Sequence, residues 1–297
     1  MILPTTEIGA DPDDIRRYVA AAEEAGYDHL LAYDHVVGAD IANRPNWPGP
    51  YTYESQFHEP LTLFGFLAAI SDLELVTGIL ILPQRQTVLV AKQAAQIDIL
   101  SRGKLRLGVG IGWNPVEYES LGMDFATKAR RIEEQMYLLR RLWTDPLVNV
   151  VTDDHRVVDA GINPLPVQRP IPLWLSGAPL GRIIERVGRL ADGWMPLGVP
   201  TAAMGEAYER IKQVAAANGR DPDAIGMQGQ LPLVGSAAGR TEELYGRWSA
   251  IGVTHIAVNT MNAGLGGVDA HITVIREAAS LLGIAHGKGE ADGNVDR

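Results

Sequence analysis

One pattern of apolar and polar positions recurs along the chain: an amphipathic helical stretch, a glycine, and then a short apolar run. In the first unit, Asp11 and Pro12 mark a helix start, apolar residues follow from Ile15 at helical spacing, and Gly26 ends the helix. The apolar run 27–33 comes directly after that glycine. The same order returns at 190–197 and 250–259, which indicates strands and helices in regular alternation.

Extended over the whole chain, the pattern predicts eight strands and eight helices. We expect strands at about 2–3, 28–33, 74–81, 104–110, 172–176, 193–197, 225–231 and 253–259. We expect helices at about 11–25, 59–71, 88–100, 127–143, 179–190, 201–218, 240–251 and 269–283. Alternation of this kind gives a parallel sheet, and eight strands close it into a barrel. The predicted fold is therefore α/β, a single-domain (β/α)8 TIM barrel over residues 1–285.

Three segments do not fit the alternation. Residues 38–57, after strand two, are rich in proline, glycine, asparagine and aromatic residues, and we expect a long loop there. Residues 144–170, between helix four and strand five, contain a predicted hairpin around Asp153 and Asp154. Residues 286–297 are polar and rich in glycine, which is typical of a flexible C-terminal tail.

Composition removes several classes of function. The formal net charge of −10 disfavours a nucleic-acid-binding surface. The chain has no cysteine, which excludes disulfides, thiolate nucleophiles and cysteine metal sites and fits a reducing cytoplasm. The most apolar stretch, 61–82, is interrupted by Asp72 and Glu74, so we predict a buried helix and strand there and no membrane span.

In a barrel of this kind, catalytic groups lie at the C-terminal ends of the strands and in the loops that follow. Strand two ends at Asp34 and His35. An imidazole titrates near neutrality and suits proton transfer to a bound molecule. The alternative is that both side chains only cap the strand end.

Glycines and a serine follow other strands. The run 108–112 has the spacing GxGxG, which is not a dinucleotide fingerprint; Gly110 and Gly112 leave backbone open to a flat ligand or to close packing. Gly78 interrupts a central strand, which indicates a bulge or the close approach of a ligand. The turn Ser176, Gly177 and Ala178 suits a phosphate, or else Ser176 is an ordinary helix N-cap.

Other kinds of site find little support. His58 and His155 have no partners at metal-ligand spacing, so no metal site is predicted. No GxSxG or other nucleophile motif is present. Trp113, like Trp47 and Tyr51 in the long loop, belongs either to a pocket wall or to ordinary packing.

Several blocks together resemble the luciferase-like monooxygenase superfamily and, within it, the branch of oxidoreductases that use coenzyme F420. The resemblance covers about residues 1–285. It rests on the blocks 25–35, 77–79, 91–105, 108–113 with Glu117 following, 172–178 and 191–194.

The resemblance implies a deazaflavin at the C-terminal mouth of the barrel. Asp34 and His35 match the Asp-His pair of that branch, whose histidine acts near the hydride-carrying carbon, and Asp34 would steady His35. Gly78 and Ile79 match the branch's non-prolyl cis peptide. The cofactor-binding residues expected on this basis are Asp34, His35, Gly78, Ile79, Gly110, Gly112, Trp113, Ser176, Gly177 and Ala178, with Arg85 and Arg182 as candidate cations for the anionic tail.

One departure separates the chain from the sugar-phosphate dehydrogenases of that branch, which carry a glutamate where this chain has Trp113. The expected function is hydride transfer between coenzyme F420 and a small organic substrate by a cytoplasmic enzyme, and the family implies a homodimer. The first alternative is an FMN-dependent monooxygenase that consumes O2. A cofactor carrier without turnover and a metal-dependent hydrolase are further alternatives.

Overall fold

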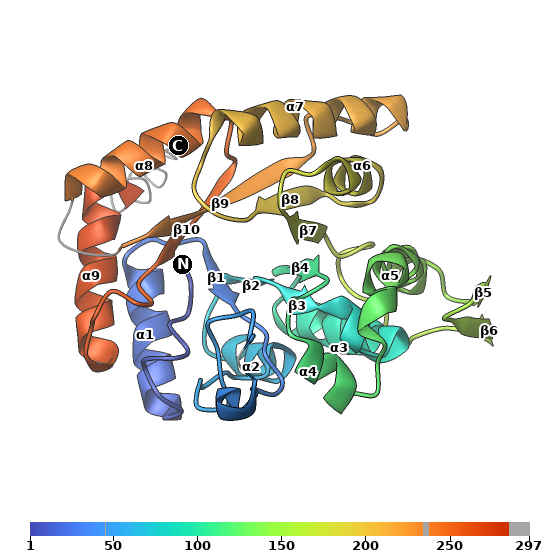
Figure 1. Ribbon diagram of the computed structural model, residues 1–297, viewed down its shortest axis with the longest axis horizontal. Coiled ribbons are helices and arrows are strands. Elements are labelled where there is room, and N and C mark those ends of the chain that lie inside the picture. Colours follow the sequence, from blue (N-terminus) through green and yellow to red (C-terminus); the bar gives the residue numbers. More distant parts are fainter. Residues whose placement is uncertain (45, 234–237, 285–297) are drawn as a thin grey trace, which may run out of the picture.

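The computed structural model describes residues 1–44, 46–233 and 238–284. Eight of its strands form one parallel sheet in the order β1-β2-β4-β7-β8-β9-β10, with β3 paired to β4 (Figure 1). The strands are β1 (His29–Ala32), β2 (Glu74–Thr77), β3 (Leu80–Ile81), β4 (Leu105–Gly110), β7 (Leu173–Gly177), β8 (Gly193–Pro196), β9 (Gly226–Pro232) and β10 (His255–Asn259). The predicted strand order around a TIM barrel is confirmed.

The N-terminal residues close the ring between the first and last strands. Ile2 forms a parallel bridge with Leu31 of β1 and donates its N–H to the carbonyl of Val258 in β10. Leu3 and Leu31 are joined by a further backbone hydrogen bond. The predicted strand at 2–3 is therefore as short as its sequence predicts, yet it gives both β1 and β10 a hydrogen-bonding partner at the edge of the sheet.

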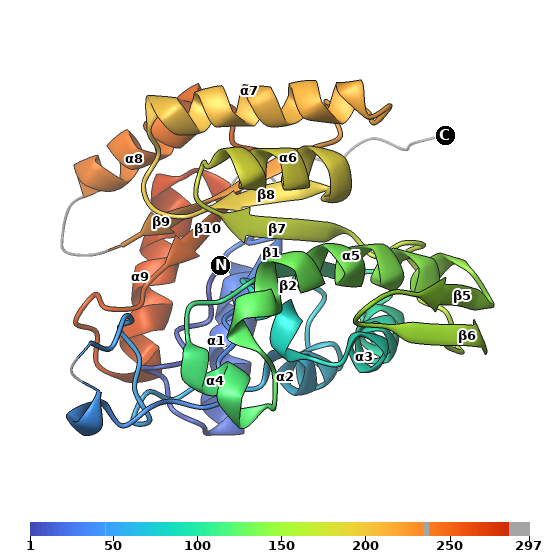
Figure 2. The ribbon, with the colours of Figure 1, turned by 45° about the vertical axis from the view of Figure 1, so that its right-hand side comes forward.

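Helices surround the ring of strands, and each follows the strand that the alternation predicts (Figures 1 and 2). They are α1 (Pro12–Glu24), α2 (Pro60–Leu67), α3 (Thr87–Leu100), α5 (Lys128–Thr144), α6 (Gly181–Leu190), α7 (Ala202–Ala217), α8 (Ala238–Ala250) and α9 (Gly267–Leu281). Asp11 caps α1 by accepting a hydrogen bond from the N–H of Asp13, and Pro12 occupies the first turn, as the sequence predicts. A short helix, α4 (Pro115–Ser120), follows β4 and was not predicted.

The third predicted strand, 74–81, is broken in two. The peptide bond between Gly78 and Ile79 is cis and separates β2 from β3, in the place that the family resemblance implies. Gly78 is also required by packing, because a Cβ there would lie 2.1 Å from the side chain of Leu31. The break leaves Ile79 and Ile81 beside the mouth of the barrel.

Both predicted insertions are present. Residues 38–57 contain only a 3-10 turn, Ile41–Asn43, within their described part. The second insertion carries an antiparallel hairpin, β5 (Val148–Val151) and β6 (Arg156–Ala160), with Asp153 and Asp154 in its turn. The predicted C-terminal tail, 286–297, lies outside the described residues.

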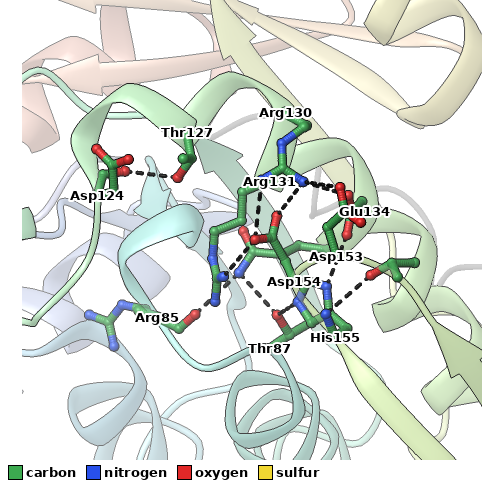
Figure 3. A network of polar contacts seen from close by, with 12 residues as sticks. Arg85, Thr87, Asp124, Thr127, Arg130, Arg131, Glu134, Asp153, Asp154 and His155 are labelled. Carbon is green, nitrogen blue, oxygen red and sulfur yellow. Dashed lines mark hydrogen bonds and ion pairs between the residues drawn. The ribbon is translucent and has the colours of Figure 1, made fainter.

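A polar network holds the hairpin turn against α3 and α5 (Figure 3). His155 contacts the Thr87 hydroxyl through Nε2 at 2.6 Å and Glu134 through Nδ1 at 3.4 Å. Arg130 forms ion pairs with Glu134, Asp153 and Asp154. The insertion is therefore fixed by side chains from two barrel helices.

Candidate active site at the mouth of the barrel

A cavity of about 550 Å³ opens where the strands end. Its wall comes from residues at or just after the ends of β1, β2, β3, β4, β7 and β8, together with Gln228 and Gln230 of β9. Most of the lining is aliphatic or aromatic, with a few polar groups among it. A volume and lining of this kind are typical of a small-molecule or cofactor site.

His35 lies in this wall, and its partner is Glu117. The Nδ1 atom of His35 is 2.9 Å from Oε1 of Glu117, and the N–H of Val36 donates to the same oxygen at 3.0 Å. The Glu117 side chain is 2% exposed and comes from α4. Because an ionised carboxylate only accepts hydrogen bonds, the pair places a proton on Nδ1. Nε2 makes no hydrogen bond with the described residues and is not buried.

Asp34 does not perform the role expected for it. Its carboxylate accepts hydrogen bonds from the N–H of Ile81 and from Arg85, both at 2.8 Å, and makes none to His35. Burial raises the pKa of Asp34, and the Arg85 guanidinium and the Ile81 amide oppose part of that rise. Asp34 therefore ties β3 to the end of β1, and the steadying of His35 falls to Glu117.

The glycines expected at the cofactor divide into two groups. Gly78 and Gly112 line the cavity, and Gly112 has φ +62°, which favours glycine. Gly110 does not line it, and a Cβ at Gly110 would lie 1.9 Å from Cδ1 of Ile79. Gly110 is thus explained by packing against Ile79, and the structure gives no support for Gly110 as a cofactor contact.

Ser176, Gly177 and Ala178 line the cavity where β7 leads to α6. The interpretation of Ser176 as a helix N-cap is wrong, because the N-cap position is Leu180 and no side chain caps the helix. The first-turn N–H groups of an α-helix have no partner within the helix and carry partial positive charge. An uncapped helix start beside a serine suits an anionic group.

Of the two cations suggested for an anionic tail, only one is available. Arg85 is bound to Asp34 and to Glu59, so both ends of its guanidinium are occupied. Arg182 is exposed in the first turn of α6, two residues after Leu180. Arg182 therefore remains a candidate and Arg85 does not.

Aromatic side chains from the long loop and from the end of β4 surround the His35 ring. Tyr51 and Phe57 of the loop and Trp113 after β4 approach it edge-on, with centroids 5.0, 4.5 and 5.6 Å away. Trp47 packs on Trp113, and their ring centroids are 5.3 Å apart. The loop therefore covers the histidine and narrows access to it.

Sequence patterns missed Glu117 as the partner of His35, although its block was part of the resemblance. The two residues are 82 positions apart, and α4 is too short to give a clear periodic pattern. A weak signal was present in Asn114 and Pro115, which form an N-cap and a first helical position before Glu117. The structure shows that α4 begins there.

Among the described residues, no three or more His, Asp or Glu side chains gather in a way that could hold a metal ion. Within the same part of the chain, each helix is too short or too polar to span a bilayer.

Comparisons with known proteins agree with the architecture. A family model described as luciferase-like monooxygenase matches residues 2–248. F420-dependent glucose-6-phosphate dehydrogenase of Amycolatopsis mediterranei is 30% identical over 193 residues, 62% of this chain and 53% of that protein. FMNH(2)-dependent dimethylsulfone monooxygenase of Pseudomonas putida is 27% identical over 213 residues, 70% of this chain and 55% of that protein.

The chain thus spans about half the length of these two relatives. Among solved structures, monooxygenase RslO1 from Streptomyces bottropensis superposes with a TM-score of 0.73 at 19% identity, covering 95% of this chain and 97% of that one. At that identity the structural likeness shows the fold alone.

Proposed function

Because the chain belongs to the luciferase-like monooxygenase family, we propose that it is an oxidoreductase that passes hydride between coenzyme F420 and a small organic substrate. Relatives include a protein named as F420-dependent and one named as FMNH(2)-dependent, so the comparisons support a flavin-type cofactor of either kind. The observation that carries the choice of the deazaflavin is His35. It stands in an otherwise largely apolar wall with Nε2 open, in the place where the F420 branch carries its histidine.

The residues present fit such a cofactor. A cavity of about 550 Å³ has room for a tricyclic ring. Ile79, Gly112 and Trp113 would contact the ring, and Ser176, Gly177 and Ala178 with the start of α6 would hold its anionic arm. When bound, the deazaflavin would supply hydride chemistry, and the protein would position it and exclude water.

The chain's own contribution is a proton. Glu117 binds Nδ1 of His35, so Nε2 is the ring nitrogen available for proton transfer. It can give a proton to a substrate oxygen or take one from it. Asp34 acts at a distance, since it holds Ile81 and thereby the bulge at Gly78 and Ile79. A homodimer in the cytoplasm is part of the same proposal, supported by the family resemblance and by the absence of cysteine.

An FMN-dependent monooxygenase is the second candidate. It is favoured by the Pseudomonas putida relative, which matches a larger share of this chain than the F420-dependent one does. A carbon in place of the flavin N5 disfavours reaction with O2. Oxygen consumption by the reduced, loaded protein, followed with an oxygen electrode, therefore separates the two candidates.

The direct test is a titration of the purified protein with coenzyme F420 and with FMN, followed by cofactor fluorescence. We expect tighter binding of F420, by about tenfold or more, and Ser176→Ala with Gly177→Asp should weaken it because a carboxylate would then face the anionic arm. Arg182→Ala tests the candidate cation. Tighter binding of FMN would overturn the choice of cofactor.

A further inference from the structure

We propose that the cavity selects an uncharged, mostly apolar substrate with one hydroxyl or carbonyl group, and that it rejects phosphorylated and carboxylate-bearing molecules. This inference rests on the proposed function, because it names the substrate class of the same site. It concerns which molecules can lie beside His35, and it does not depend on which flavin-type cofactor is bound.

The first observation is the charge of the lining. Neither the main cavity nor the adjoining one of about 290 Å³, which shares His35, Tyr51 and Asn114 with it, has a lysine or arginine among its described lining residues. An enzyme that binds a phosphate or carboxylate substrate normally supplies a cation or a bidentate arginine for it. The described linings of both cavities lack such a cationic side chain.

The second observation is that carboxylates are present in the wall. Asp34 and Glu117 both line the cavity, and their side chains are buried. The guanidinium behind them, Arg85, is shared between Asp34 and Glu59. Arg85 thus pairs with Asp34 and Glu59, whereas Glu117 contacts His35 and no arginine or lysine among the described residues. Counted together, three carboxylates stand against one guanidinium, and a protonated His35 would still leave the formal charge negative. An anion at His35 would be repelled at a low local dielectric, where such repulsion is strong.

The third observation is the chemistry of the remaining wall. Around His35 it is aromatic, from Tyr51, Phe57 and Trp113. Deeper in the barrel, the hydroxyl of Tyr33 contacts Oε1 of Gln230 at 3.2 Å and Nδ2 of Asn259 at 3.4 Å. Burial raises the pKa of Tyr33, so this chain of groups stays neutral at physiological pH. Neutral polar groups in an apolar wall bind a hydroxyl or carbonyl and orient it.

Among the described lining residues, those at the start of α6 offer amides that suit an anion, and the proposed function assigns these amides, like the nearby Arg182, to the arm of the cofactor. This assignment makes the inference testable. If those amides instead receive a substrate phosphate, phosphorylated molecules will bind better than neutral ones of the same shape.

The experiment compares three probes of one shape: cyclohexanol, cyclohexanecarboxylate and cyclohexyl phosphate. Binding to the whole protein is measured by ligand-observed NMR with and without coenzyme F420, and initial rates are measured with the loaded protein. We expect cyclohexanol to bind at least about tenfold more tightly than either anion, most clearly with the cofactor present. Equal or tighter binding of an anion, or failure of cyclohexanol to bind, would overturn the inference.

A matched pair of variants adds a positive control. Leu197 is at the rim of the cavity and 61% exposed, whereas Leu147 lies near the hairpin, away from the cavity lining, and is 63% exposed. Leu197→Lys should raise the affinity for the two anions by about tenfold, and Leu147→Lys should leave it unchanged. Equal behaviour of the two variants would show that the cavity's charge does not govern selection.

The outcomes separate this inference from the proposed function. If the protein prefers cyclohexanol but binds neither F420 nor FMN, the cofactor proposal fails and the substrate class stands. If F420 binds tightly and cyclohexyl phosphate is preferred over cyclohexanol, the cofactor proposal stands and the substrate class is wrong.

Discussion

Two histidines of this protein form the same pair with a carboxylate and differ at the other nitrogen. His35 lines the cavity and contacts Glu117 through Nδ1, and its Nε2 is not buried and makes no hydrogen bond with the described residues. His155 contacts Glu134 through Nδ1, but its Nε2 meets the Thr87 hydroxyl at 2.6 Å (Figure 3). A histidine with both nitrogens satisfied holds structure, whereas one with a free nitrogen in a cavity can exchange a proton with a ligand.

The difference also shows in the surroundings of each pair. Thr87 accepts a hydrogen bond from Gln135, so its own hydrogen is free for Nε2 of His155. These contacts join α3, α5 and the turn of the hairpin, and both ring nitrogens of His155 have a hydrogen-bonding partner. Around His35, by contrast, aromatic rings approach edge-on, and no described residue forms a hydrogen bond with its Nε2. Contact with a carboxylate therefore does not by itself identify a catalytic histidine.

The largest expected effect is at His35. His35→Ala removes the only imidazole among the described cavity-lining residues and should slow hydride transfer by about 10²-fold or more, within the range of acid–base groups, while the fold is retained. His155→Ala is the matched control and should leave turnover unchanged. Stopped-flow oxidation or reduction of the bound cofactor measures both. A His35→Ala enzyme with normal turnover would remove His35 from the mechanism.

The next effect is at Glu117. Glu117→Gln keeps the shape of the side chain but removes its charge, and charge-assisted hydrogen bonds contribute about 1.5–3 kcal/mol. We expect kcat to fall about tenfold or more, with little change in KM, and Glu117→Asp should recover part of the loss. A changed pH profile of kcat would distinguish the positioning of His35 from a purely structural role. Equal kcat values for Glu117→Gln and the unaltered protein would contradict the proposal that Glu117 positions His35.

A smaller effect, on stability alone, is expected at His155. His155→Gln breaks the contacts to Thr87 and Glu134 and should lower the free energy of unfolding by about 1–2 kcal/mol. Urea unfolding followed by circular dichroism measures it. Turnover at a temperature well below the unfolding transition should remain normal, and a large loss of kcat would show that the two histidines are coupled.

The smallest effect concerns pH. Burial lowers the pKa of His155 below its usual value, and Glu134 opposes part of that shift. At pH values between the folded and the unfolded pKa of His155, the unfolded chain binds more protons than the folded protein. The contribution of neutral His155 to the free energy of unfolding is therefore fully present above about pH 6.5. It is lost as the pH falls through the folded pKa. Unfolding curves from pH 7.5 to 5 should therefore show a shallower loss for His155→Gln than for the unaltered protein. Parallel curves would contradict this.

Much of the fold could be predicted from the sequence, because each unit carries its own local signals. The cap at Asp11, the glycine at Gly26 and the apolar run after it determine a helix and a strand without reference to the rest of the chain. The hairpin was located from its turn at Asp153 and Asp154 for the same reason. The boundaries of the eight predicted helices shifted by a few residues, because helix ends depend on capping and packing.

Less of the site could be predicted, because its contacts are not local. His35 follows from its place at a strand end, but Glu117 contacts it from 82 positions away, and Arg85 contacts Asp34 from 51 positions away. The sequence pairs Asp34 with its neighbour His35, because it shows which residues are adjacent along the chain and not which are adjacent in space. The glycine run is compatible with a bound ligand and with close packing. The position of the Ile79 side chain in the fold shows that packing explains Gly110.

The most direct test of the difference between the two histidines is a 15N NMR spectrum of imidazole-labelled protein, recorded with and without coenzyme F420. The account predicts that neutral His35 carries its proton on Nδ1 and that its Nε2 resonance shifts when the cofactor is added, while both resonances of His155 stay in place. A neutral His35 protonated on Nε2, or a His35 signal that does not respond to the bound cofactor, would contradict the account.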